Sequence, residues 1–159
     1  MRPLDDFLPD YEFSERHRIA VRAEAAVIDR ALREVTFSDI PLGHALVRLR
    51  GIDARADRRV VQSLSSRGTV LEDEPGEGIV LATSGQFWRL RGDDPSGDRA
   101  EAVVDFRSTR GELTTETRVH VPAPAARRKF ARYWRLIRPF SGLLRILVLR
   151  AAKRRAEAG

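Results

Sequence analysis

The chain ends in RRKFARYWRLIRPFSGLLRILVLRAAKRRAEAG, from Arg127 to Gly159. Its apolar residues recur at steps of three, one and four, which keeps them on one face of a helix. They are Phe130, Tyr133, Trp134, Ile137, Phe140, Leu144, Leu147, Val148 and Ala151. We therefore predict a long amphipathic helix over residues 123–157. Pro139 lacks a backbone donor and clashes with the preceding turn, so we expect the helix to kink or restart there.

This C-terminal segment is also strongly basic. It holds eleven basic residues and one acidic residue, a net charge of +10, whereas the whole chain carries +6, which leaves residues 1–126 at −4. Two interpretations remain open. The basic side chains are the solvated face of a helix that covers the core, or the end of the helix projects past the body and contacts an anionic membrane or partner. The contact residues would be Arg145, Arg150, Lys153, Arg154 and Arg155.

The residues before this segment alternate between strand and helix patterns. Period-two alternation predicts a half-buried strand over 11–22, and helical spacing predicts helices over 24–35 and 42–50. Residues 58–66 fit either a helical turn or a linker. We predict further strands over 69–74, 79–91, 99–110 and 113–121, a turn at 75–78 and a loop at 92–98. An antiparallel sheet with an apolar face needs a cover, and the C-terminal helix is the only predicted element large enough.

The fold class that follows is α+β, a single domain over residues 1–159. Residues 11–122 form a curved antiparallel sheet with two short helices after its first strand, and the sheet wraps around the C-terminal helix. The strand Ser14–Val21 running into Ala23–Leu32, and the tail from Tyr133 to Pro139, resemble the helix-grip superfamily. This group, also called SRPBCC, includes START-like and polyketide-cyclase-like proteins. The resemblance implies a ligand cavity between sheet and helix, and a last strand paired with the first. Its members have many activities, so the fold leaves the activity open.

The candidate ligand site combines a few polar residues with an apolar wall. Glu15 and His17 fall on the apolar side of the first strand, and Thr115 and Thr117 share that face if the last strand pairs with the first. A few polar groups in an apolar hollow are typical of a ligand pocket. We expect Glu15, His17, Thr115 and Thr117 to orient the polar end of a ligand. Its apolar part would contact Phe106, Tyr133, Trp134 and Ile137.

The favoured function is binding or carriage of a hydrophobic or amphipathic small molecule, and we favour a binding protein over an enzyme. One alternative is a cyclase- or dehydratase-like enzyme with Glu15 and His17 as its acid–base pair. The other is a non-enzymatic adaptor that uses the basic helix on an anionic membrane or a partner. We expect no nucleic-acid partner, because the basic end has no recognised binding motif and no interleaved aromatic residues.

Several classes of site are not expected from this sequence. Cysteine is absent, and the three histidines, His17, His44 and His120, do not have the spacing of a zinc helix, so we predict no metal and no cofactor. No nucleophile-elbow, phosphate-loop or dinucleotide pattern occurs. No apolar run approaches the ~20 residues that span a bilayer. We expect a cytoplasmic protein, with peripheral membrane contact as the open alternative, and the sequence does not predict an oligomeric state.

Overall fold

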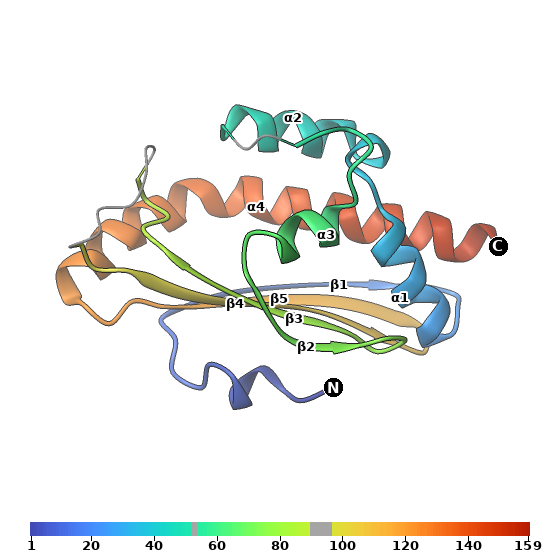
Figure 1. Cartoon of the computed structure of the whole chain (residues 1–159), viewed down its shortest axis with the longest axis horizontal. Coiled ribbons are helices and arrows are strands. Elements are labelled where there is room, and N and C mark those ends of the chain that lie inside the picture. Colours follow the sequence, from blue (N-terminus) through green and yellow to red (C-terminus); the bar gives the residue numbers. More distant parts are fainter. Residues whose placement is uncertain (52–53, 90–96) are drawn as a thin grey trace.

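The computed structural model describes residues 1–51, 54–89 and 97–159. Within them, one antiparallel sheet of five strands packs against a long C-terminal helix, so the predicted α+β fold is confirmed (Figure 1). The elements in chain order are η1 (Leu4–Asp6), β1 (Phe13–Ala20), α1 (Ala25–Glu34), η2 (Phe37–Asp39), α2 (Pro41–Leu49), α3 (Val60–Ser65), β2 (Thr69–Glu74), β3 (Gly78–Gly85), β4 (Ala100–Thr109), β5 (Glu112–His120) and α4 (Pro124–Ala158).

The strands lie in the order β1-β5-β4-β3-β2, and each neighbouring pair is antiparallel. The last strand therefore pairs with the first, with Glu15 opposite Thr117 and His17 opposite Thr115. Ser14, Arg16 and Arg18 of β1 are exposed, as the alternation predicts for the solvent face. The strand predicted over 79–91 ends earlier, at Gly85. Most of the loop predicted over 92–98 lies outside the described residues.

Helix α4 runs without interruption through Pro139. Of the two outcomes expected at this proline, a kink or a restart, the restart is therefore wrong. At ~1.5 Å per residue, a helix of 35 residues is ~52 Å long. Figure 1 shows it lying across one face of the sheet over most of the length of the strands.

The core between the sheet and the helices has two parts. The larger part joins α1 to the second half of α4, where Ile28 and Leu32 pack with Leu149 and Ala152. The smaller part surrounds Phe130 near the start of α4. Both parts lie along one helix face, which is the face that the apolar spacing of the sequence marks as buried.

Two short elements complete the fold. Helix α3 forms within the segment that the sequence leaves open between a helical turn and a linker, and it lies on the same side of the sheet as α4 (Figure 1). The opposite face is covered in part by the N-terminal segment, whose Leu4 and Leu8 pack on Val80 and Val103. The sequence pattern does not predict this second cover.

Candidate functional site

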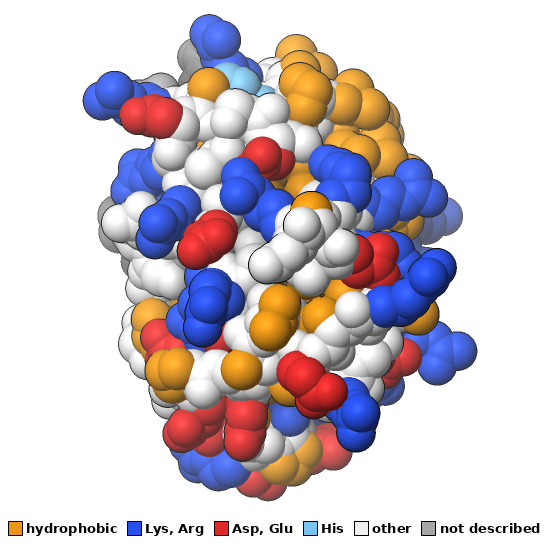
Figure 2. All heavy atoms as spheres, turned by 90° about the vertical axis from the view of Figure 1, so that its right-hand side faces the viewer, with side chains coloured by type: hydrophobic (Ala, Val, Ile, Leu, Met, Phe, Trp, Pro, Cys, Tyr) orange, Lys and Arg blue, Asp and Glu red, His pale blue; other side chains and the backbone are white. Residues whose placement is uncertain are grey.

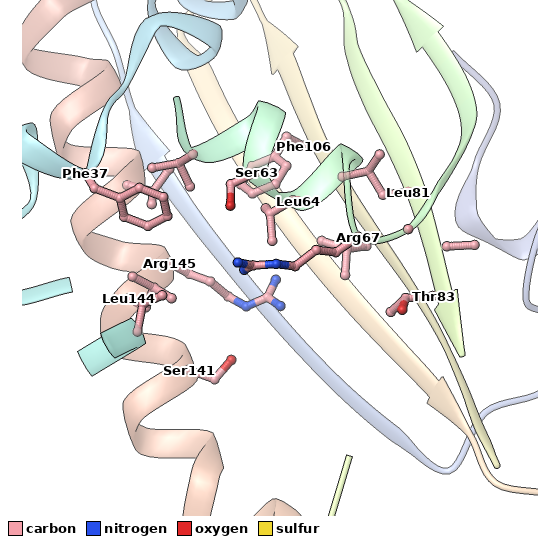
Figure 3. Close-up of a pocket in the computed structure, with 16 residues that line it drawn as sticks. Phe37, Ser63, Leu64, Arg67, Leu81, Thr83, Phe106, Ser141, Leu144 and Arg145 are labelled. Atoms are coloured by element: carbon pink, nitrogen blue, oxygen red, sulfur yellow. The ribbon is translucent and has the colours of Figure 1, made fainter. Parts of the chain in front are cut away.

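An apolar cavity of about 290 Å³ lies between the sheet, α3 and α4. Its strand walls come from β3, which contributes Leu81, Ala82 and Thr83, and from β4, where Val104 and Phe106 are two residues apart and so share a face. Figure 3 shows α3 and α4 on either side of it. The lining residues are Phe37, Val47, Val60, Ser63, Leu64, Arg67, Gly68, Leu81, Ala82, Thr83, Val104, Phe106, Ser141, Leu144, Arg145 and Val148.

Most of the residues that line the cavity are hydrophobic, and several of them pack against the main core on their other side. Leu81, Phe106 and Val148 are each at most 5% exposed and belong to the main core, as do Phe37 and Val60. A cavity with well-packed apolar walls keeps its shape without a bound molecule, since its side chains are held by their neighbours. Its volume is at the lower end of the range of small-molecule pockets, which begins near ~300 Å³.

Arg145 enters this cavity from α4, where the sequence led us to expect an exposed, anion-contacting side chain. That expected exposure is corrected here: Nε is buried without a hydrogen-bond partner among the described residues, and Nη1 lies 3.3 Å from Thr115 Oγ1 as its donor. Burial lowers the pKa of the Arg145 guanidinium, and the charges of Glu15 and Asp105 raise it part of the way back. Arg145 lies three residues before Val148 and four before Leu149, both buried, so helical spacing is the signal that reveals its position.

Two further polar residues of the cavity come from the α3 region, and the sequence analysis did not single them out. Ser63 is 1% exposed, and its Oγ has no hydrogen-bond partner within the described ranges. Arg67 follows α3 and is exposed at the cavity edge. Figure 3 shows the guanidinium groups of Arg67 and Arg145 pointing toward one another across the cavity. Apart from its position after a short helix, no feature of the sequence marks Arg67.

The four polar residues predicted on β1 and β5 do come together, beneath α4. Glu15 is 8% exposed, Thr115 0% and Thr117 5%. His17 Nε2 lies 3.0 Å from Glu15 Oε1, although their orientation is not that of a hydrogen bond, and Arg138 Nε lies 3.9 Å from the same oxygen. Thr115 Oγ1 donates to the backbone oxygen of Asp105 at 2.7 Å. These residues form a polar cluster next to Arg145, but none of the four lines the cavity.

The predicted apolar residues separate into different places. Phe106 lines the cavity. Tyr133 and Trp134 instead pack around Phe130, in the smaller part of the core, with ring centroids 5.7 and 5.8 Å from that ring. Ile137 is half-buried and is not among the cavity residues. Periodicity therefore predicts which helix face is buried, but it does not predict where along that face a cavity opens.

The basic end of α4 lies against the body rather than projecting from it. Lys153 Nζ donates to the backbone oxygen of Ala20 at 2.6 Å, and Arg154 Nη2 to that of Asp39 at 3.3 Å. Arg155 forms an ion pair with the Asp39 carboxylate at 2.9 Å. Arg150 is exposed. Of the two interpretations of this segment, the projecting arm is therefore wrong, and Leu149 within the segment is 1% exposed.

A second exposed region combines apolar and basic residues. Helix α2 lies antiparallel to α4: a Cβ on Gly43 would be 2.8 Å from Leu144, and Arg50 Nη2 donates to Tyr133 Oη at 2.6 Å. Large apolar side chains of both helices are exposed, namely Leu42, Leu49, Leu136, Phe140 and Leu143, and we call this set the α2–α4 patch. Figure 2 shows hydrophobic side chains gathered at the top of the molecule, where α2 lies in Figure 1, next to Lys and Arg side chains.

Within residues 1–51, 54–89 and 97–159, no helix has the length and apolarity that crossing a membrane requires. The same ranges contain no group of three or more His, Cys, Asp or Glu side chains placed to hold a metal ion. His44 bonds the backbone oxygen of Ala54, and His120 lies beside Glu12.

Comparison with known proteins gives no family for this chain. No family model matches it, and no curated protein does. An AHSA1-like protein from Rhizobium etli, solved by NMR, is 15% identical with a TM-score of 0.36, over 92% of this chain and 86% of that one. A DUF4468 family protein from Bacteroides ovatus is 8% identical with a TM-score of 0.33, over 67% of this chain. The match spans 53% of the Bacteroides protein, about half of its length. Likenesses this remote assign neither a family nor a function.

Proposed function

We propose that this protein binds a small amphipathic molecule in the cavity between its sheet, α3 and α4. The observation that carries the proposal is a preformed apolar space with two arginines and a buried serine on its walls. Ligand sites have this composition: mostly hydrophobic walls with a few polar groups that fix orientation. An unfilled apolar space costs stability unless a ligand occupies it, because the side chains around it lose packing contacts.

Binding fits the geometry better than acid–base catalysis does. Glu15 and His17 are close to one another, as a catalytic pair must be. Neither residue lines the cavity, however, and Gly142 of α4 packs directly over both. A substrate in the cavity would therefore meet Arg145 rather than the Glu15–His17 pair. This arrangement supports a binding protein over a cyclase- or dehydratase-like enzyme.

A cavity-filling variant tests the proposal. Ser63→Leu adds a larger side chain at a buried wall position, while Gln62→Leu adds the same group at an exposed position of the same helix. We would purify wild type and both variants from the native host and compare their masses under native and denaturing conditions. A small molecule should accompany wild type and Gln62→Leu and be lost from Ser63→Leu, with thermal unfolding as the check on folding. Equal retention by Ser63→Leu would contradict binding in this cavity.

A second candidate function is contact with an anionic membrane through the α2–α4 patch. Leu136, Phe140 and Leu143 are spaced by four and three residues, so they share one side of α4. Lys129 and Arg132 precede them on that side, and Arg150 and Arg154 follow them. An apolar stripe between basic groups is typical of helices that lie on anionic bilayers, where each basic residue contributes ~1 kcal/mol.

Vesicle flotation tests this second function. Wild type should float with phosphatidylserine-containing vesicles, not with pure phosphatidylcholine, and flotation should fall as salt rises. The double variant Leu136→Ser/Phe140→Ser should lose it, whereas Val27→Ser, at a partly exposed position of α1, should not. Equal flotation with both vesicle types, or flotation unaffected by the double variant, would contradict binding of an anionic membrane through the α2–α4 patch.

A further inference from the structure

We propose that the ligand of the cavity carries one carboxylate, which the guanidinium of Arg145 binds, and a short aliphatic body that lies on Leu81, Phe106 and Val148. This inference deepens the proposed function and rests on it. It names the chemical class of the ligand, an aliphatic monocarboxylate, and the residue that distinguishes this class from neutral molecules of the same shape.

The first support is the state of Arg145 without a ligand. Its Nε is buried and unpartnered, and no carboxylate of the described residues lies within ion-pair distance of its guanidinium. Thr115 Oγ1, which already donates to Asp105, is its hydrogen-bond acceptor at 3.3 Å. Arg145 is half-buried as a residue, but an enclosed and unpartnered guanidinium Nε is costly, and a carboxylate in the cavity would supply both charge and hydrogen-bond acceptors.

The second support is the position of a second cation. Arg67 lines the same cavity from the exposed side, and its guanidinium faces that of Arg145 (Figure 3). Arg67 adds positive charge at the open side of the cavity, so an anionic head between the two guanidinium groups would be attracted by both. The head of the ligand therefore lies on the line between the two arginines, at the side of the cavity that Arg67 borders.

The charge of the ligand's head group should match the positive charge that the cavity encloses. Arg145 is half-buried, with its Nε enclosed, whereas Arg67 is exposed to solvent. A guanidinium matches one carboxylate in charge and in the spacing of its two oxygens. A phosphate monoester brings a charge of about −1.5 to −2 and three acceptor oxygens, which leaves more charge in the cavity than Arg145 neutralises. The geometry therefore favours a carboxylate head over a phosphate head.

The size of the cavity limits the body of the ligand. At ~30 Å³ for each water-sized group, 290 Å³ holds about ten non-hydrogen atoms. Octanoate, which has about that number, is a suitable probe. The rest of the lining is mostly aliphatic and aromatic, which suits a saturated chain with no further polar group.

Calorimetric titration of wild type with octanoate, 1-octanol and octyl phosphate tests this inference. Octanoate should bind at least roughly tenfold more tightly than the alcohol, because hydrogen bonds between charged groups are worth that much. Equal affinity for octanoate and 1-octanol would overturn the carboxylate assignment and leave the proposed function standing. Tighter binding of octyl phosphate would also overturn it. Binding of none of the three would contradict the inference and the binding of aliphatic ligands of this size together.

A pair of variants identifies the arginine. In Arg145→Met, the affinity for octanoate should fall roughly tenfold to that for 1-octanol, whose own affinity should not change. Arg135→Met removes an exposed arginine of the same helix and should change neither. If Arg145→Met retains the preference for octanoate, another residue binds the head. Should this variant fail to fold, the wild-type comparison still decides whether the ligand class is correct.

Discussion

Gly142 of α4 lies directly over Glu15 of β1, so that a Cβ added at Gly142 would be 2.7 Å from Glu15 Oε1 and 3.3 Å from His17 Nε2. The absence of a side chain at this position is what lets α4 approach the polar cluster. Since glycine is unfavourable inside a helix by ~1 kcal/mol relative to alanine, its presence here reflects close packing rather than helix formation.

Gly142→Ala should therefore lower the free energy of unfolding by ~1 kcal/mol, because the strain against Glu15 exceeds the gain in helix propensity. In a Glu15→Ala background the strain is relieved, and the same substitution should instead stabilise by ~1 kcal/mol. Urea unfolding of the four proteins of this double-mutant cycle measures the coupling. Additive effects on the free energy of unfolding would show that a side chain at position 142 does not clash with Glu15.

Gly78 begins β3 and Gly111 directly precedes β5. Both glycines have positive φ angles, +143° and +86°, yet substitution by alanine should have different effects at the two positions. A Cβ at Gly111 meets no atom within 4 Å, so the substitution costs only the backbone penalty of ~1–2 kcal/mol. A Cβ at Gly78 would be 2.0 Å from the backbone oxygen of Phe106, which cannot move without breaking the β3–β4 pairing. Gly78→Ala should cost at least ~3 kcal/mol in thermal or urea unfolding. Equal losses would contradict the close approach at Gly78.

Asp39 predicts a specific pH dependence. Burial raises its pKa, but the hydrogen bonds from the Thr36 backbone and Arg155 outweigh burial, so that the pKa is lowered below the ordinary value of 3.8. A lowered carboxyl pKa contributes stability above the unfolded-state pKa, and this stability is lost as the pH falls through the folded-state value. Asp39→Asn should thus lower the free energy of unfolding by ~1 kcal/mol at pH 7.

The difference between Asp39→Asn and wild type should shrink as the pH falls below ~4, where the wild-type carboxylate becomes protonated as well. Asp57→Asn is the matched control, since Asp57 is 74% exposed and its ion pair with Arg55 is 3.4 Å long. The free energy of unfolding of Asp57→Asn should equal that of wild type at every pH. If Asp39→Asn lowers the free energy of unfolding equally at every pH, the loss comes from altered packing or hydrogen bonding and not from the missing charge.

Arg145 should be a source of instability while the cavity is unliganded. Burial lowers its pKa, which means that the folded state disfavours its charged form. Arg145→Met keeps the length of the side chain and removes the charge, so it should raise the free energy of unfolding by ~1 kcal/mol or more. Urea unfolding of delipidated protein measures this. A large destabilisation would show instead that the contact with Thr115 outweighs the cost of burial.

The strand pattern predicted much of the polar cluster. Alternation placed Glu15 and His17 on the inner face, and the pairing of the last strand with the first brought Thr115 and Thr117 beside them. The first step depends on a period of two, which holds wherever one face of a strand is buried, whereas the pairing of the two strands was expected from the resemblance to the helix-grip superfamily. Whether these four residues bind a ligand stays a prediction, because they lie beside the cavity and not on its wall.

A cavity between sheet and helix was expected from the resemblance, but most of the residues that line it could not be predicted from the sequence, for two reasons. Its wall includes Val60, Ser63 and Leu64 of α3, a helix of six residues that is too short to have a periodic signature. It also depends on Arg145, which we assigned to the surface because of its charge although its helical spacing places it on the buried face. The charge of Arg145 favoured the surface, whereas its spacing along the helix favoured the buried face. The structure has it at the cavity, as the spacing indicates.

The continuity of α4 has a mechanical consequence. Leu143 is partly exposed in the α2–α4 patch, and the next residue, Leu144, is part of the cavity wall. Consecutive residues of a helix point ~100° apart, so any roll of this rod about its axis moves both side chains at once. A contact that rolled the helix from its outer surface would therefore also change the volume of the cavity beneath it.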